Sequence, residues 1–200
     1  MIKLKNLLTE ALDDLYHSTG VESVVDILED DKIRLTFGAA NIGTETQHMK
    51  GRHFFLSMMR QKVGNYMRGS SVTKLYANHI YAVLQLDGRL LSKNYKIGPV
   101  DYWGWGRDKS EQEDRLVSYK DHIPNATKYI KAVHVFVPKD KKLLTNAFTN
   151  EIMIKFDRVA KSKGVDVYYY TDVNYFMQHR TSGASTELGD LIPDPVFSDN

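Results

Sequence analysis

Three short segments carry side chains that could do chemistry, and the first is Tyr16-His17-Ser18-Thr19. It ends a strand-like run, after which Gly20 turns the chain into a helical pattern. A histidine can donate or accept a hydrogen bond at neutral pH, and the free N–H groups that begin the next helix suit a phosphate or a ribose. The alternative is structural, with a core histidine and a serine or threonine that caps the helix.

The second segment, Phe54-Phe55-Leu56-Ser57-Met58-Met59-Arg60, predicts a strand that delivers the hydroxyl of Ser57 near its end. Arg60 then begins the next element. A hydroxyl and a guanidinium placed in this way suit the orientation of a carboxylate or the binding of a phosphate. An ordinary strand end would carry the same residues, so this segment also has a structural interpretation.

The third segment is acidic and runs Glu111-Gln112-Glu113-Asp114-Arg115. In an extended chain, residues two apart point to the same face, so Glu111 and Glu113 would project together into one site. Like charges side by side are unfavourable unless a cation or a hydrogen-bonded ligand lies between them. The alternative is a solvated acidic turn.

Periodicity and turn residues predict the elements that must position these segments. Strands are expected at 15–19, 33–35, 54–58, 80–86, 132–137 and 165–171, and helices or helical turns at 4–15, 21–28, 60–67 and 146–163. Asp87-Gly88 predicts a turn from which the chain returns over 89–92. Long loops are expected at 38–51 and 97–109, and the chain beyond Tyr175 is expected to be irregular.

Composition limits the class of protein. The 200 residues are 42% hydrophobic, which is enough for one domain with a proper core. The 27 basic and 25 acidic residues nearly cancel, so the net charge of +2 gives no overall attraction to nucleic acid or a membrane. Cysteine is absent, which excludes disulfides and thiol nucleophiles. No apolar run approaches the roughly 20 residues that span a bilayer, so a soluble, intracellular protein is expected.

Taken together and in this order, the three segments resemble the ADP-ribosyltransferase superfamily, from about Leu15 to Val137. Its members carry a first strand with His or Arg, a second with a Ser-containing motif, and a third with a catalytic Glu, often in Glu-x-Glu. The closer likeness is to phage-encoded members with Tyr-His-x-Thr, Phe-Leu-Ser-x-x-Arg, Leu-Asp-Gly-x-x-Leu and Glu-x-Glu-Asp-Arg-Leu. The resemblance implies an α+β fold, a split β-sandwich with flanking helices in a single domain over residues 15–175, between an N-terminal helix at 1–14 and an irregular tail at 176–200.

The resemblance also implies that NAD is a substrate and that the first segment binds it. His17 would hydrogen-bond the ribose hydroxyl on the adenosine side. Thr19 or the neighbouring backbone would hold the nicotinamide amide, and Tyr16 and Ser18 complete the NAD-binding segment. Arg60 would lie near the pyrophosphate.

The catalytic group implied by the resemblance is Glu113, oriented by Ser57. Its carboxylate would grip the 2′-hydroxyl of the nicotinamide ribose and stabilise the positive charge that develops on that sugar as nicotinamide leaves. Glu111 matches the position that activates or selects the acceptor in arginine-modifying members.

The chain mixes the patterns of two branches of the superfamily. His17 belongs with the His-Tyr-Glu branch, whereas Ser57 and the Glu-x-Glu belong with the Arg-Ser-Glu branch. The aromatic partner that would stack on nicotinamide therefore stays open. The candidates are Tyr66, Tyr102, Trp103 and Phe55.

The activity implied is transfer of ADP-ribose from NAD to a host macromolecule in the bacterial cytoplasm during phage infection, a protein rather than a nucleic acid. The alternatives are an NAD glycohydrolase or RNA 2′-phosphotransferase-like enzyme of the same fold, and a non-catalytic virion or host-binding protein. Leu8-Thr9-Glu10 is similar to the Leu-x-Glu signal that phages cleave on proteins packaged in the capsid. That likeness would make residues 1–10 a removable packaging tag.

Overall fold

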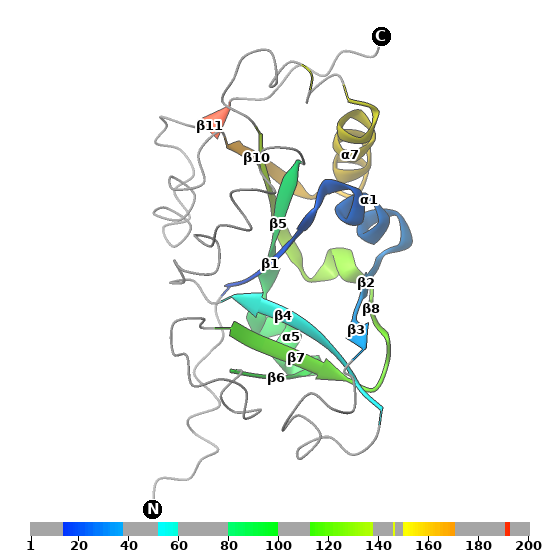
Figure 1. Cartoon of the computed structure of the whole chain (residues 1–200), viewed down its shortest axis with the longest axis vertical. Coiled ribbons are helices and arrows are strands. Elements are labelled where there is room, and N and C mark those ends of the chain that lie inside the picture. The colour runs from blue at the N-terminus through cyan, green and yellow to red at the C-terminus, as the bar shows by residue number, and fades with distance from the viewer. Residues whose placement is uncertain are drawn as a thin grey trace, which may run out of the picture.

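The first candidate segment forms a strand inside a large sheet, with a different strand on each side (Figure 1). This strand, β1, spans Asp14–Gly20. The computed structural model describes residues 14–37, 52–59, 80–99, 113–137, 146, 150–170 and 191–192. The predicted strand at 15–19 is confirmed, and Gly20 ends it as expected.

The other predicted strands, at 33–35, 54–58, 80–86, 132–137 and 165–171, are also present, whereas the strands at 36–37, 96–99 and 122–124 were not predicted. The strands are β2 (Lys32–Arg34), β3 (Thr36–Phe37), β4 (Phe54–Met59), β5 (Tyr81–Asp87), β6 (Lys96–Pro99), β7 (Glu113–Ser118), β8 (His122–Pro124), β9 (Ile130–Phe136), β10 (Asp166–Tyr170) and β11 (Leu191–Ile192). The helices are α1 (Val21–Asp30), α5 (Gly88–Asn94) and α7 (Glu151–Ser162), with a short 3-10 helix at Ala126–Lys128.

The main sheet is mostly antiparallel and makes the protein a mixed α and β fold in a single domain. Its strands lie in the order β11-β10-β9-β5-β1-β4-β7-β6. Strand β3 pairs with the first two residues of β4. The pair β9 and β10 is parallel, and α7 lies between these two strands in the chain. Strands β2 and β8 form a separate two-stranded sheet.

The main sheet changes character between β1 and β4. Seven residue pairs join β1 to β5, and six join β4 to β7. Between the described residues of β1 and β4, the pairing is Tyr16 opposite Met59. Figure 1 shows β4, β7 and β6 running at an angle to β1 and β5. We call this junction the β1–β4 seam, and two of the three candidate segments meet there.

Helices α1 and α7 lie side by side and cover one face of the sheet (Figure 1). The apolar residues of α1 recur at helical spacing, and the predicted stripe is confirmed because all four of its members are buried. They are Val21, Val24, Val25 and Leu28. Helix α7 contributes Met153, Phe156 and Ala160, which pack with strand residues such as Leu84 and Val133 in one core.

The opposite face of the sheet is also largely buried, but its residues are more polar and aromatic. Alternation along β1, β5 and β9 places Tyr16, Val83 and His134 on this face, and each is less than a tenth exposed. We call it the second face, in contrast to the helix-covered face. Ser18, Ser57 and Arg115 also belong to it by the register.

The hairpin predicted at Asp87-Gly88 is wrong, because Asp87 caps a helix instead. Its carboxylate accepts a hydrogen bond from Leu90 N–H at 2.8 Å, and α5 follows. The sheet explains the difference: β5 already has β1 on one side and β9 on the other, so no edge remains for a returning strand. The buried side chain of Leu91 then anchors α5.

The tail also differs from the prediction. Within the stretch 176–200, which was expected to be irregular, Leu191–Ile192 forms β11 and pairs with Tyr169 and Tyr170 of β10. Helix α7 begins at Glu151, later than the predicted 146, because Asn150 caps it through its side chain. Residues 97–99, at the start of the predicted loop, instead belong to β6, which pairs with β7. The predicted helices at 4–15 and 60–67, the loop at 38–51 and the rest of the loop at 97–109 lie outside the described residues.

Candidate functional site

His17 crosses the β1–β4 seam with a side-chain hydrogen bond. Its Nδ1 lies 2.8 Å from the carbonyl oxygen of Ser57. A carbonyl can only accept, so Nδ1 carries the proton. Burial lowers the pKa of His17 below its usual value, although the bond to Ser57 acts in the opposite direction. The ring is therefore neutral at pH 7, and the lone pair of Nε2 is left as an acceptor without a partner in the described part of the chain.

The residues after His17 do not cap α1. The N-cap is Gly20, which has no side chain that could bond to the first turn of the helix. The structural alternative of a capping serine or threonine is therefore wrong for Ser18 and Thr19. The Oγ of Ser18 is instead buried, with no hydrogen-bond partner among the residues that the structure describes, and Thr19 is half-buried on the face of His17.

Ser57 lies on the far side of the seam, in the middle of three neighbouring strands. Strand β4 pairs with β1 on one side and with β7 on the other. While the carbonyl of Ser57 bonds His17, its half-buried hydroxyl has no hydrogen-bond partner among the residues that the structure describes. This hydroxyl is therefore available to orient another group.

Glu113 is the first residue of β7, opposite Met59 in the register. Because Met59 is also opposite Tyr16, positions 16, 59 and 113 form one row across three strands. Alternation puts position 113 on the second face with Ser18 and Ser57, and Ser57 is its diagonal neighbour. The side chain of His17 lies on the helix-covered face, and its ring bonds the backbone of Ser57 across the β1–β4 seam.

The structure thus brings together four of the candidate positions, namely 17, 18, 57 and 113, and leaves others undecided. Tyr16 is fully buried beside His134, with ring centroids 6.4 Å apart. The predicted residues Glu111, Arg60 and Tyr66, like Tyr102 and Trp103, lie outside the described residues, as does the side chain of Glu113.

Arg115 was not among the predicted site residues, although it lies on the second face directly opposite Ser57. Its guanidinium stacks on the ring of Phe55, 4.6 Å from the centroid, and the residue is only 6% exposed. One face of Phe55 is thus taken, which weakens its case as a nicotinamide partner. The signal was present in the sequence, because residues 113 and 115 share a face of an extended strand.

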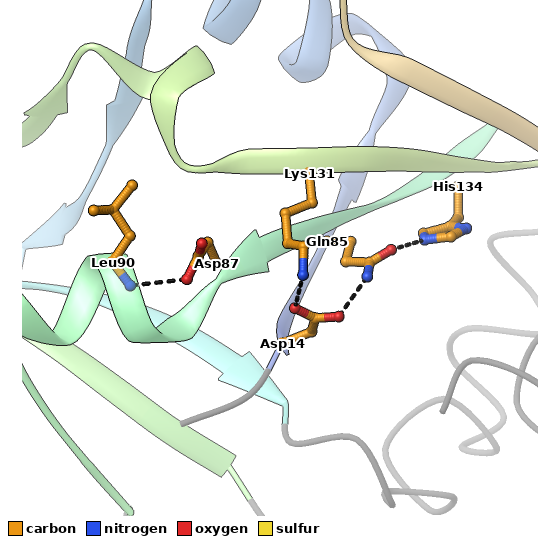
Figure 2. Close-up of polar contacts among 6 residues, drawn as sticks. All are labelled: Asp14, Gln85, Asp87, Leu90, Lys131 and His134. Atoms are coloured by element: carbon orange, nitrogen blue, oxygen red, sulfur yellow. Dashed lines mark hydrogen bonds and ion pairs between the residues drawn. The ribbon is translucent and has the colours of Figure 1, made fainter. Parts of the chain in front are cut away.

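A chain of hydrogen bonds on the second face ties β1 to its neighbours (Figure 2). Asp14 accepts from Gln85 Nε2 at 2.6 Å and from Lys131 Nζ at 2.7 Å. The amide oxygen of Gln85 is then left for His134, whose Nε2 is 2.9 Å away. His134 Nδ1 lies 3.1 Å from the hydroxyl of Tyr170.

These bonds fix the proton positions in the chain. An amide oxygen only accepts, so His134 donates from Nε2 and its Nδ1 accepts from the hydroxyl of Tyr170. Burial lowers the pKa of His134 to about 3, so the ring is neutral at pH 7. A neutral ring matches this directional pattern, because a protonated one could not accept from Tyr170. The sequence analysis took His134 only as part of a buried strand.

The bonded chain holds β1, β5, β9 and β10 in a fixed relation on one side of the seam. It lies beside Tyr16, which is opposite Gln85 in the register. No group of three potential metal ligands gathers among the described residues. No helix in the described part of the chain is long and apolar enough to cross a membrane.

No protein-family model matches the chain, and no curated protein sequence is significantly similar to it.

Proposed function

We propose that the protein is an enzyme that uses NAD as an ADP-ribose donor and transfers ADP-ribose to a bacterial protein. The observation that carries the proposal is the adjacency of the three candidate segments, which occupy β1, β4 and β7, three strands side by side. These segments are separated by tens of residues in the sequence. Their placement on three neighbouring strands favours a shared site over three unrelated strand ends.

The seam offers the kind of groups that a nucleotide needs. A neutral His17 presents Nε2 as an acceptor for a ribose hydroxyl. The hydroxyl of Ser57 is within reach of position 113, its diagonal neighbour, and can donate to a carboxylate there.

The reaction breaks the bond between C1′ of the ribose and the nicotinamide nitrogen. Nicotinamide leaves with the bonding electron pair as a neutral molecule, and C1′ becomes oxocarbenium-like. In this proposal the Glu113 carboxylate accepts a hydrogen bond from the 2′-hydroxyl and stabilises that positive charge. The acceptor then attacks C1′ and loses its proton. The contribution of the protein is positioning and electrostatics.

The test is transfer of label from NAD carrying a labelled adenylate to bacterial lysate. Glu113→Gln preserves shape and removes the charge, so transfer should fall by a hundredfold or more, on the order of the loss when a stabilising group is removed from a developing charge. Asp14→Asn is the control, because it keeps the side-chain shape at a carboxylate away from the row. It should retain most of the activity.

Different outcomes separate the alternatives. Free ADP-ribose that accumulates without a labelled macromolecule would replace transfer with NAD hydrolysis. Equal transfer by the parent and by Glu113→Gln would show that Glu113 has no catalytic role. No consumption of NAD in any condition would contradict the proposal as a whole.

A further inference from the structure

Arg115 carries a permanent positive charge on the second face, two residues after the proposed catalytic position. The residue is only 6% exposed, and its guanidinium keeps its proton at any physiological pH. Burying a charge is unfavourable unless an opposite charge and hydrogen bonds offset the loss of water. The neighbours of Arg115 in the sheet indicate why a cation is kept at this place.

Those neighbours leave the guanidinium of Arg115 over β4. On β6 the residue opposite is Gly98, which has no side chain. On β4 the residue opposite is Ser57, and the guanidinium stacks on the ring of Phe55, 4.6 Å from the centroid. The stack uses one flat face of the guanidinium, whereas its N–H groups point outward in the plane. They can therefore donate to a carboxylate while the stack is kept.

Position 113 is the acidic position that this geometry offers to Arg115. Residues 113 and 115 point to the same face of β7, roughly 7 Å apart along the strand. Ser57 is directly opposite Arg115 and diagonal to position 113, so the three positions adjoin one another on one face. Among the described residues of β1, β4, β6 and β7, the other acidic residues are Asp114, on the helix-covered face, and Asp14, whose carboxylate already accepts two hydrogen bonds.

Other titratable groups around position 113 do not supply a positive charge. Strand β4 carries no titratable side chain, and Tyr16, in the same row on β1, is uncharged at neutral pH. His17 lies on the helix-covered face, and its ring is neutral because burial lowers its pKa. On β6 the cation of the second face is Lys96, which is exposed and two residues further from position 113 than Arg115 is.

We infer that Arg115 is a positioning residue that acts through Glu113: its guanidinium pairs with the Glu113 carboxylate, keeps it ionised and holds it beside the hydroxyl of Ser57. This inference rests on the proposed use of NAD and adds to it the cation that prepares the catalytic carboxylate. The ionised carboxylate is the form that stabilises positive charge on the ribose, so the pair sets the lower end of the pH range in which the enzyme works.

The first test is the pH profile of NAD consumption at saturating NAD, with Arg115→Met and Arg115→Lys in the full chain. Without the cation the carboxylate is harder to ionise, so the acid limb of Arg115→Met should move up by about one pH unit. On that limb the rate then falls about tenfold, whereas above it the rate stays close to that of the parent. Arg115→Lys keeps the charge and should keep the acid limb near its place. A residue that only packs would lower the rate at every pH alike.

Arg34→Met is the matched control, because it removes the same charge from an exposed position on β2, in the separate two-stranded sheet. Its pH profile should coincide with that of the parent.

The second test is a double-mutant cycle on the melting temperature at pH 7, which needs no activity. Removal of one partner from a buried pair leaves the other charge uncompensated. The loss in the double variant Glu113→Gln, Arg115→Met should therefore be smaller than the sum of the two single losses. The same cycle with Arg34→Met in place of Arg115→Met should be additive.

Two results would overturn the inference while leaving the proposed function intact, namely additive losses in the cycle and an acid limb at the same pH in the parent and Arg115→Met. If Arg115→Met does not fold but the double variant does, the pair is supported. If neither folds, Arg115 has a structural role that does not depend on Glu113, and the inference fails. A coupled pair in a parent that consumes no NAD would contradict the proposed function and leave a structural ion pair.

Discussion

The buried imidazole of His134 should make the stability of the protein depend on pH. Its pKa is about 3 in the folded protein, against an ordinary value of 6.5. Between these values the unfolded chain binds a proton that the folded protein does not. Stability is therefore fully present above pH 6.5 and is lost as the pH falls toward 3.

The size of the effect follows from linkage. Each pH unit between the two pKa values costs about 1.4 kcal/mol. From pH 7 to pH 4.5, His134 alone should lower the free energy of unfolding by about 2.5 kcal/mol. Other titrating groups also make the unfolding free energy depend on pH. The contribution of His134 is therefore isolated by comparing the parent with His134→Gln.

The assay is urea unfolding of both proteins at pH 7 and at pH 4.5. At pH 7, His134→Gln should be less stable by about 1–3 kcal/mol, because Tyr170 loses its partner. At pH 4.5 the parent should have lost about 2.5 kcal/mol of unfolding free energy relative to His134→Gln, so the difference between the two proteins should become smaller or change sign. Tyr170→Phe is the control: it removes the same bond but keeps the buried ring, so it should retain the slope of the parent. A gap between parent and His134→Gln that is the same at both pH values would refute the reasoning.

Three further predictions concern other parts of the structure. Asp87→Ala should cost about 1 kcal/mol of unfolding free energy in urea melts, because the N-cap bond to Leu90 is lost, whereas Asp87→Asn should cost only a few tenths. Phe156→Ala should cost about 3–5 kcal/mol through the cavity left under α7, and a loss below about 1 kcal/mol would contradict its place in the core. NAD affinity, measured by calorimetry, should be constant near neutral pH and should fall as the pH is lowered, with a midpoint below pH 6.5. The reason is that burial lowers the pKa of His17 and only the neutral ring accepts at Nε2. Affinity that rises as the pH is lowered through this range would exclude a neutral acceptor, because the protonated ring would then be the form that binds.

Local sequence patterns predicted an element correctly where the surrounding structure favours the same conformation as the pattern does. The apolar stripe of α1 predicted both the helix and the face that it buries. The dipeptide Asp87-Gly88 was ambiguous, since it suits a tight hairpin as well as a helix start. The position of β5 between β1 and β9 decided between them, and strand order is not visible in a local pattern. Strand β11 is two residues long, too short for any periodicity.

The sequence predicted individual residues of the candidate site, whereas their relative positions depend on how the strands pair in the sheet. The sequence singled out His17 and Ser57, and the bond between them depends on a pairing 40 residues apart. Arg115 was within reach of the same alternation argument that joined Glu111 to Glu113. The hydrogen bonds from Asp14 through Gln85 to His134 could not be predicted in this way, because in the sequence each of these residues is an ordinary member of its own strand.

The most direct test of the central claim is release of nicotinamide from NAD by the purified protein, measured by chromatography in a single turnover with the protein in excess. The account predicts release by the parent, a rate at least a hundredfold lower for Glu113→Gln, and a rate near that of the parent for Asp14→Asn. Release at the same rate from the parent and from Glu113→Gln, or no release from the parent in the presence of bacterial lysate, would contradict it.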